Sequence, residues 1–526
     1  MKKIIDLFFI KSLVIGITLR IIYLLTKTGE VAKINLGGDP CHHFNIAYNI
    51  SKLNGPKTDF IFSFWHRHEV LPALTDIYPP GFHLFAALFI FFYDEFLITR
   101  IIPFVIFLLN IYFTILIGKR LQRHDLGVLT SFLILINFYH IENSVVFMTV
   151  TFYMLLTQIF FYLLIIFDQN KKFIFFLGLS VGYASISFGG WQIFMLIVLI
   201  YFFKNKHKIY KDYFLFIAGF MFIAIPWGLY TYDYFGTIYY SNLNFYPILK
   251  DWNEMNISTT KPNLINFINN TDLIKFTTMH FFWFLDHLKT FSLRLFPTFL
   301  FPLYFMLIPL IILGAIKLKR YGVYFLIFIF LYLISISLSS YALGGNLFTR
   351  HFVPLLFLTS FLLSSGIIFI YNKYFTQKSF IFIKYQNICL IVIFIISASG
   401  ILLKDSFWNK NTKPFFLLGK KIQKIVPINS KIMYGTTPQD LWCVSNRQIV
   451  LDPNDMQNFQ NIYRQNRTRE EIDFYKPDYL LLDFSKHIYD RSNNDLNNTM
   501  NKHYNLNLSL ELSDEINGYY LYKINH

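Results

Sequence analysis

The sequence has few cysteines and few charged residues for its length. Only three of its 526 residues are cysteines, which excludes the disulfide framework of a small secreted domain. Asp, Glu, Lys and Arg make up 15% of the residues, whereas ordinary soluble proteins contain about 25%. Hydrophobic residues account for 55% of the chain and aromatic residues for 20%, so a disordered chain is excluded as well. A membrane protein with many spanning helices remains.

Acidic residues are scarce relative to basic ones. The chain has 47 Lys and Arg against 31 Asp and Glu, which gives a net charge of +16. Such a charge also occurs in proteins that bind nucleic acid, but here the basic residues form short clusters between apolar runs. This pattern is typical of membrane topology. We therefore expect the lipid bilayer as a partner and no nucleic acid.

Apolar runs long enough to cross a bilayer recur along the chain, each near the roughly 20 residues that a spanning helix needs. They lie at Ile4–Leu25, Phe96–Gly118, Ser144–Phe167, Phe173–Phe203, Tyr213–Tyr230, Phe296–Ile316, Tyr321–Ser340, Phe352–Tyr371 and Phe380–Leu403. Gly189-Gly190 interrupts the longest run, which predicts two short helices there. With the shorter runs Pro79–Phe92 and Leu126–Phe138, the sequence predicts a mainly α, polytopic protein with about 11 to 12 membrane or half-membrane helices.

The basic clusters predict the orientation of these helices. Lys and Arg gather on the cytoplasmic side of membrane proteins, so we expect a cytoplasmic N-terminus in the cell membrane. Residues 26–95, residues 231–295 and the tail then lie outside the cytoplasm. This alternation requires one short run not to cross. We expect Pro79–Phe92 to be the run that does not cross, because Asp94 and Glu95 follow it rather than Lys or Arg.

The composition changes near residue 405. Residues 1–405 are expected to form the membrane domain and residues 406–526 a small soluble extracytoplasmic domain, α/β or mostly β. Short alternating runs predict strands at Lys431–Tyr434, Gln448–Leu451 and Tyr479–Asp483. Cys389 lies in a predicted span, which leaves Cys41 and Cys443 on the outer side. Two cysteines are too few to indicate a disulfide framework, and we do not expect them to be joined.

The first outer loop contains the most suggestive polar residues. Asp39 and Pro40 read as the N-cap and first position of a helix, and His43 follows four residues later on the same side. A carboxylate and an imidazole at the membrane surface are able to bind a divalent cation such as Mg²⁺ or Mn²⁺, or to accept a proton from an attacking hydroxyl. The alternative is an ordinary helix cap with exposed histidines.

Further along this loop, Tyr78-Pro79-Pro80-Gly81 opens an apolar helix. This order of parts resembles the GT-C glycosyltransferases. The matching stretches are Leu19-Arg20-Ile21-Ile22-Tyr23 at the end of the first run, Gly-Gly-Asp-Pro-x-x-His-x-x-x-Ala-Tyr at residues 37–48, and Tyr-Pro-Pro-Gly. The superfamily includes protein O-mannosyltransferases, the lipid A aminoarabinose transferase and the catalytic subunit of oligosaccharyltransferase. Residues 346–354, Asn-Leu-Phe-Thr-Arg-His-Phe-Val-Pro, are similar to the start of a late span in mannosyltransferase-like members.

The resemblance implies transfer of a sugar from a polyprenyl-phosphate donor to an extracytoplasmic acceptor, which is a protein, a lipid or a glycan. It also implies that Asp39 binds the acceptor or a metal, with His43 as a second possible metal ligand. A second acidic motif of two residues normally follows the third or fourth span. Only Glu142 stands in the matching stretch, so it is expected to assist as a second catalytic residue.

Cations are expected near the donor, because a departing phosphate develops negative charge that Arg stabilises. Arg350 and His351, at the outer mouth of a predicted span, are candidates, and Arg294 is another. His43 and Tyr78 complete the predicted substrate-binding residues. Asp286-His287, in the second outer loop, read as surface or as residues that orient the substrate.

Two other functions fit the sequence. A transporter or flippase of lipid-linked sugars would carry charged residues at mid-membrane, whereas the candidates here cluster at loop mouths. An inactive scaffold of an envelope glycan complex stays possible because the second acidic motif is incomplete.

Overall fold

The computed structural model describes most of the chain, with gaps in the longer loops. The described residues are 2–27, 39–61, 71–75, 77–93, 97–187, 189–205, 209–238, 241, 268–269, 271–294, 304–339, 349–374, 379–403, 413–434, 438–451, 470–483, 507–514 and 519–525.

Helices make up most of this structure. They are α1 (Lys2–Lys27), α2 (Asp39–Ser51), α3 (Gly81–Phe92), α4 (Ile98–Arg120), α5 (His124–Ile136), α6 (Phe138–Asn143), α7 (Val150–Gln169), η1 (Lys171–Phe173), α8 (Ile174–Ser185), α9 (Gln192–Asn205), α10 (Ile209–Phe235), α13 (Leu273–Arg294), α14 (Tyr304–Lys317), α15 (Arg320–Ser339), η5 (Thr349–Phe352), α16 (Val353–Tyr374), α17 (Ser379–Leu403), α18 (Lys413–Ile425) and α19 (Pro438–Ser445). The described parts of the predicted apolar runs therefore form helices, except that the run from Ser144 becomes helical only at Val150.

Six helices in the described part are long and apolar enough to cross a membrane. These segments are Ile5–Thr26, Ile98–Arg120, Val150–Gln169, Lys211–Phe235, Arg320–Leu338 and Arg350–Tyr374. Shorter apolar helices include Gly81–Phe92 and His124–Ile136. The long run that starts at Phe173 is divided as predicted, since α8 ends at Ser185 and α9 begins at Gln192. The protein is thus a polytopic integral membrane protein.

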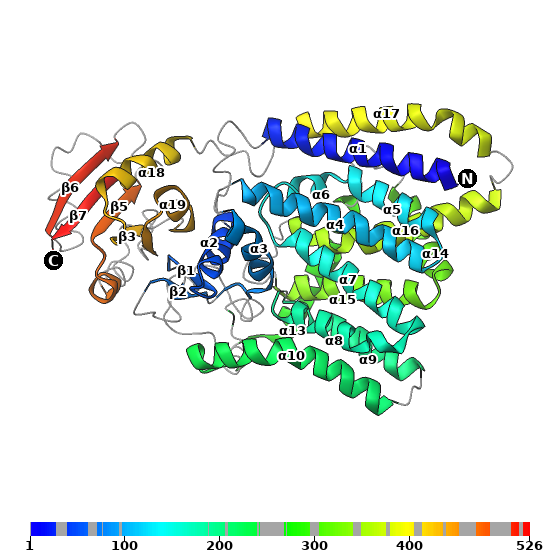
Figure 1. Cartoon of the computed structure of the whole chain (residues 1–526), viewed down its shortest axis with the longest axis horizontal. Helices are drawn as coiled ribbons and strands as arrows, with labels where there is room; N and C mark the ends of the chain where they lie inside the picture. The colour runs from blue at the N-terminus through cyan, green and yellow to red at the C-terminus, as the bar shows by residue number, and fades with distance from the viewer. Residues whose placement is uncertain are drawn as a thin grey trace.

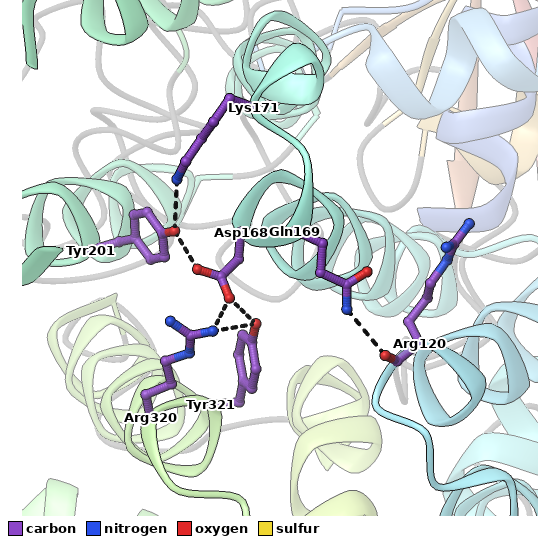
Figure 2. A network of polar contacts seen from close by, with 7 residues as sticks. All are labelled: Arg120, Asp168, Gln169, Lys171, Tyr201, Arg320 and Tyr321. Atoms are coloured by element: carbon purple, nitrogen blue, oxygen red, sulfur yellow. Dashed lines mark hydrogen bonds and ion pairs between the residues drawn. The ribbon is translucent and has the colours of Figure 1, made fainter. Parts of the chain in front are cut away.

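A polar network joins three helices of the bundle at one end (Figure 2). Asp168, near the end of α7, accepts hydrogen bonds from Tyr201 of α9 (2.6 Å) and Tyr321 of α15 (2.8 Å), and it pairs with Arg320. Lys171 in turn lies 3.4 Å from the Tyr201 hydroxyl. The Asp168 side chain is only 10% exposed, so its carboxylate needs these partners in place of water. The same contacts hold the ends of the three helices together.

The C-terminal part contains a five-stranded mixed sheet of order β4-β3-β5-β7-β6. Its strands are β3 (Lys431–Tyr434), β4 (Gln448–Leu451), β5 (Tyr479–Asp483), β6 (Asn507–Asp514) and β7 (Tyr519–Asn525). The strands β3, β4 and β5 run parallel, while β7 runs antiparallel to both β5 and β6. The three strands predicted from the sequence are confirmed residue for residue. The proposed boundary near residue 405 falls in 404–412, outside the described residues, and stays a prediction.

The sheet and the N-terminus lie at opposite ends of the molecule (Figure 1). The sheet, α18 and α19 form one end, and α2 and α3 lie between them and the helix bundle. In the first outer loop, β1 (Lys57–Thr58) pairs antiparallel with β2 (Ala73–Leu74). The expectation for the cysteines is wrong, because Cys41 of α2 and Cys443 of α19 form a disulfide bond. A sequence separation of 402 residues hides this proximity from any local pattern.

Candidate active site

The site begins at the first turn of α2, where Asp39 meets Arg350. One Nη atom of Arg350 donates to Oδ2 of Asp39 at 2.5 Å. Arg350 lies in η5, the short turn that precedes α16. The side chain of Arg350 is 15% exposed and that of Asp39 is 32% exposed. The pair is thus sheltered yet open to an incoming group, and it joins two of the residues that the sequence singled out.

Tyr78 binds the other oxygen of the same carboxylate. Its hydroxyl donates to Oδ1 of Asp39 at 3.2 Å. Tyr78 is held by the start of α3, where the backbone N–H of Gly81 donates to the carbonyl oxygen of Ile186 at 2.6 Å. A Cβ atom at position 81 would lie 2.8 Å from that oxygen and would also clash with the side chain of Ser187. The glycine of Tyr-Pro-Pro-Gly is therefore required by the close approach of α3 to the end of α8.

His43 points into the protein rather than into solvent. Its Nδ1 atom lies 3.0 Å from Nε2 of His83, and Nδ1 of His83 lies 3.1 Å from the carbonyl oxygen of Pro79. A carbonyl only accepts hydrogen bonds, so neutral His83 carries its proton on Nδ1 and accepts from His43 through Nε2. The ring of His43 packs 4.4 Å, centroid to centroid, from that of Tyr78. His43 thus packs against the ring of Tyr78 and helps to fix its position.

The histidines of α2 are buried, which contradicts the alternative of an exposed pair. His42 is 4% exposed and His43 is 1% exposed. Burial lowers the pKa of His42 to about 3, although nearby Asp39 opposes this shift. Burial, His83, His42 and Arg350 together lower the pKa of His43 well below its usual value. Both imidazoles are therefore neutral at physiological pH.

Glu142 lies on α6, which contacts η5. It is 8% exposed, and its Oε1 accepts a hydrogen bond from Tyr23 of α1 at 2.9 Å. Glu142, the second predicted acidic residue, thus lies on the helix that contacts the turn carrying Arg350.

The residues predicted for the site do not include Arg20, which the structure shows to be buried at 2% exposure. Its guanidinium donates to Ser144 Oγ (2.8 Å) and to the carbonyl oxygens of Gly16 (2.8 Å) and Leu135 (3.1 Å), and it lies 2.6 Å from His140 Nδ1. These contacts hold α1 against the segment that carries Glu142. The sequence does contain an indication of this role, because an arginine inside an apolar span is costly unless other groups bind it.

The other predicted residues contribute less to the described geometry. His351 follows Arg350 in η5, and its carbonyl oxygen accepts from Tyr332 of α15 at 3.1 Å. Arg294 is the last residue of α13, and its side chain lies outside the described residues. His287 is not a surface residue, because it is 2% exposed and its Nδ1 lies 3.0 Å from Ser337 Oγ of α15.

In this arrangement Asp39 and His43 already have partners within the protein. Both oxygens of Asp39 are engaged by Tyr78 and Arg350, and Nδ1 of His43 is engaged by His83. Within the described residues, no three His, Cys, Asp or Glu side chains gather as a metal-binding group. A cation at Asp39 would have to displace Arg350, and the role of Asp39 and His43 as metal ligands stays a prediction.

Comparisons with known proteins find structural likeness without sequence likeness. No family model matches the chain, and no curated protein matches its sequence. The oligosaccharyltransferase of Archaeoglobus fulgidus, solved with Zn and sulfate, superposes with a TM-score of 0.59 at 13% identity over 91% of this chain and 68% of that one. The same enzyme, AglB, bound to an inhibitory peptide and a dolichol-phosphate gives 0.58 at 13% identity over 90% and 69%.

A second solved protein matches over nearly the full length. ArnT from Cupriavidus metallidurans bound to undecaprenyl phosphate superposes with a TM-score of 0.59 at 9% identity, covering 97% of both chains. Both proteins are GT-C glycosyltransferases. The chain thus has the fold of the GT-C membrane glycosyltransferases, as the resemblance found in the sequence implies.

Proposed function

We propose that this protein is a membrane glycosyltransferase that moves a sugar from a polyprenyl-phosphate-linked donor to an extracytoplasmic acceptor. The observation that carries the proposal is the ion pair between Asp39 and Arg350, residues 311 positions apart that meet on a GT-C fold. The lipid phosphates bound by the two similar enzymes support the donor class.

The proposed orientation has a cytoplasmic N-terminus and an extracytoplasmic C-terminal domain. The opposite placement of the N-terminus and the sheet supports this topology (Figure 1). The Cys41–Cys443 bond supports it as well, because disulfides persist outside the reducing cytosol.

The donor phosphate is the proposed partner of Arg350 during the reaction. A phosphate that approaches the pair competes with Asp39 for the guanidinium, and charge-assisted hydrogen bonds to the leaving oxygen stabilise the developing charge. Arg350 then binds the leaving group, while the carboxylate of Asp39 becomes free to interact with the acceptor.

The proposed transfer is a single displacement. The acceptor oxygen or nitrogen attacks C1 of the sugar, the bond from C1 to the phosphate oxygen breaks, and its electron pair leaves with the carrier phosphate. The acceptor proton passes to the carboxylate of Asp39, which acts as general base. One attack from the opposite face inverts the configuration at C1. Glu142, held by Tyr23, adds negative charge near the cationic sugar that develops in the transition state.

Membranes that contain the protein would be incubated with radiolabelled polyprenyl-phosphate sugars, and label in the acceptor fraction would be counted. Asp39→Asn is expected to lower transfer at least about a hundredfold, since a positioned base contributes about 10²–10⁴. Arg350→Gln is expected to lower it about tenfold or more.

The matched controls are Arg123→Gln and Asp125→Asn, which break a surface pair whose side chains are 38% and 37% exposed. Both are expected to keep wild-type transfer. Equal labelling by all five proteins would contradict the site assignment. Carrier movement across the bilayer without transferred sugar would favour the transporter.

A further inference from the structure

The C-terminal domain is covalently attached to the helix that carries Asp39. Cys41 lies two residues after Asp39, in the first turn of α2, and its disulfide partner Cys443 lies on α19. A bond at this position restrains the same helical turn that presents the carboxylate to Arg350.

A partly buried carboxylate makes a second connection between the same two parts. Asp59 Oδ2 accepts hydrogen bonds from the side-chain amides of Asn45 (2.6 Å) and Asn49 (3.1 Å), which lie one turn apart on α2. Trp442, the neighbour of Cys443, lies beside this carboxylate and, with the two amides, opposes the rise in its pKa that burial causes. One side chain of the outer loop thus bridges α2 and α19.

Main-chain pairing supplies a third connection. The N–H of Ile449 in β4 donates to the carbonyl oxygen of Asp59 at 3.0 Å, and the N–H of Ile61 donates to that of Ile449 at 2.9 Å. The outer loop therefore extends the sheet of the C-terminal domain beside β4. Phe44 of α2 packs against Trp442, with ring centroids 6.3 Å apart.

We infer that the C-terminal domain is a positioning element of the active site. Through Cys443, Trp442 and β4, it fixes the turn of α2 so that Asp39 faces Arg350 and the acceptor. This inference rests on the proposed glycosyl transfer. Arg350 itself belongs to η5, the turn before α16. These three connections do not join that turn, so the domain acts on the Asp39 side of the site.

Sugar transfer should therefore depend on the oxidised Cys41–Cys443 bond. A dithiol such as dithiothreitol passes two electrons and two protons to the cystine, which gives two protein thiols and the oxidised, cyclic reagent. The released turn of α2 would then sample positions in which Asp39 no longer faces the acceptor.

The test uses the full-length protein in lipid nanodiscs before and after reduction, with thiol release counted by a maleimide mass label. Turnover and the affinity for unlabelled undecaprenyl phosphate would be measured in parallel. We expect reduction to lower kcat at least fivefold, with the Kd for undecaprenyl phosphate changed less than threefold. A smaller fall in kcat, or a fall in kcat together with a threefold or larger rise in the Kd as in general unfolding, would overturn the inference.

Three variants separate this effect from misfolding and from the remaining cysteine. Cys389→Ser, in α17, should keep both wild-type turnover and its sensitivity to reduction. The double variant Cys41→Ser/Cys443→Ser should match the reduced wild type. Asp59→Asn keeps the disulfide but weakens the carboxylate bridge, and should lower kcat with little change in the Kd for undecaprenyl phosphate. Wild-type turnover in both the double variant and Asp59→Asn would overturn the inference.

Hydrogen exchange distinguishes this inference from the proposed function. If no state of the protein transfers sugar, the proposed function fails. The positioning claim is then judged by amide exchange, which should rise on reduction in α2 but not in α16. Unchanged exchange in α2 would overturn the positioning claim on its own.

Discussion

At the scale of single residues, the site depends on which side chains form an ion pair and which are kept neutral. Asp39 and Arg350 form an ion pair at 2.5 Å, whereas His42 and His43, on the same helix as Asp39, are held neutral by burial. The described side chains of the first turn of α2 therefore carry one negative group and no positive one. Such separation of ionisation states is what a site needs when it handles an anionic leaving group and a neutral acceptor.

The buried histidines predict that acid destabilises the protein. The pKa of His42 falls from its usual 6.5 to about 3 on folding, so between these values the unfolded chain binds protons that the folded protein does not. Stability is then retained above about pH 6.5 and falls as the pH decreases, by about 1.4 kcal/mol per pH unit for each such histidine. Melting temperatures between pH 8 and pH 5 should show this decline. His42→Asn should flatten it, and an unchanged slope would contradict the assignment.

The hydroxyl of Tyr78 predicts a selective effect on turnover. Tyr78→Phe removes the hydrogen bond to Oδ1 of Asp39 but keeps the ring that packs on His43. Hydrogen bonds to charged groups contribute about 1.5–3 kcal/mol, so transfer should fall at least about tenfold. Steady-state kinetics should show the loss in kcat rather than in donor KM. An increase in the KM for the donor with an unchanged kcat would instead indicate that Tyr78 contacts the donor.

At the scale of elements, close backbone approaches and a few polar networks position the helices around the site. The start of α3 and the end of α8 meet at Gly81, and α7, α9 and α15 are joined through Asp168 (Figure 2). Both are packing features that apolar periodicity does not reveal, because periodicity identifies a helix but not the neighbour that it touches.

The Gly81 contact predicts a strong effect of one added methyl group. Gly81→Ala would place Cβ 2.8 Å from the carbonyl oxygen of Ile186, and such overpacking costs about 1–3 kcal/mol. The melting temperature should fall, and transfer with it. Gly189→Ala is the matched control, since no atom of the described residues lies within 4 Å of a Cβ there. Equal melting temperatures for the two variants would be inconsistent with the close approach.

The Asp168 network predicts a loss of stability without a specific loss of chemistry. Asp168→Asn removes the charge that Arg320 faces and weakens the bonds from Tyr201 and Tyr321. For a group this buried the expected cost is about 1–3 kcal/mol. Denaturation in detergent should show it, whereas kcat per folded molecule should stay near the wild-type value. A kcat loss in fully folded protein would show that the network also serves the reaction.

At the scale of the whole molecule, the sequence predicts what is local and misses what is distant. The apolar helices and three strands could be predicted because apolar length and alternation are properties of short segments. The Cys41–Cys443 bond was missed because the chain must fold before these residues meet. Asp39 was named from the resemblance to a known superfamily. Arg350 was named because it lies at the mouth of a predicted span, where a cation would stabilise a departing phosphate. Arg20 was missed as a site-supporting residue because its partners come from α1, α5 and the segment after α6.

The central claim is that Asp39 and Arg350 act together in one reaction centre. A double-mutant cycle tests it most directly, with kcat/KM for sugar transfer measured in the wild type, Asp39→Asn, Arg350→Gln and the double variant. Residues that act as a unit give strongly non-additive effects. We predict that the double variant is no more than about threefold slower than the slower single variant. Losses that multiply in the double variant, or single variants as active as the wild type, would contradict the account.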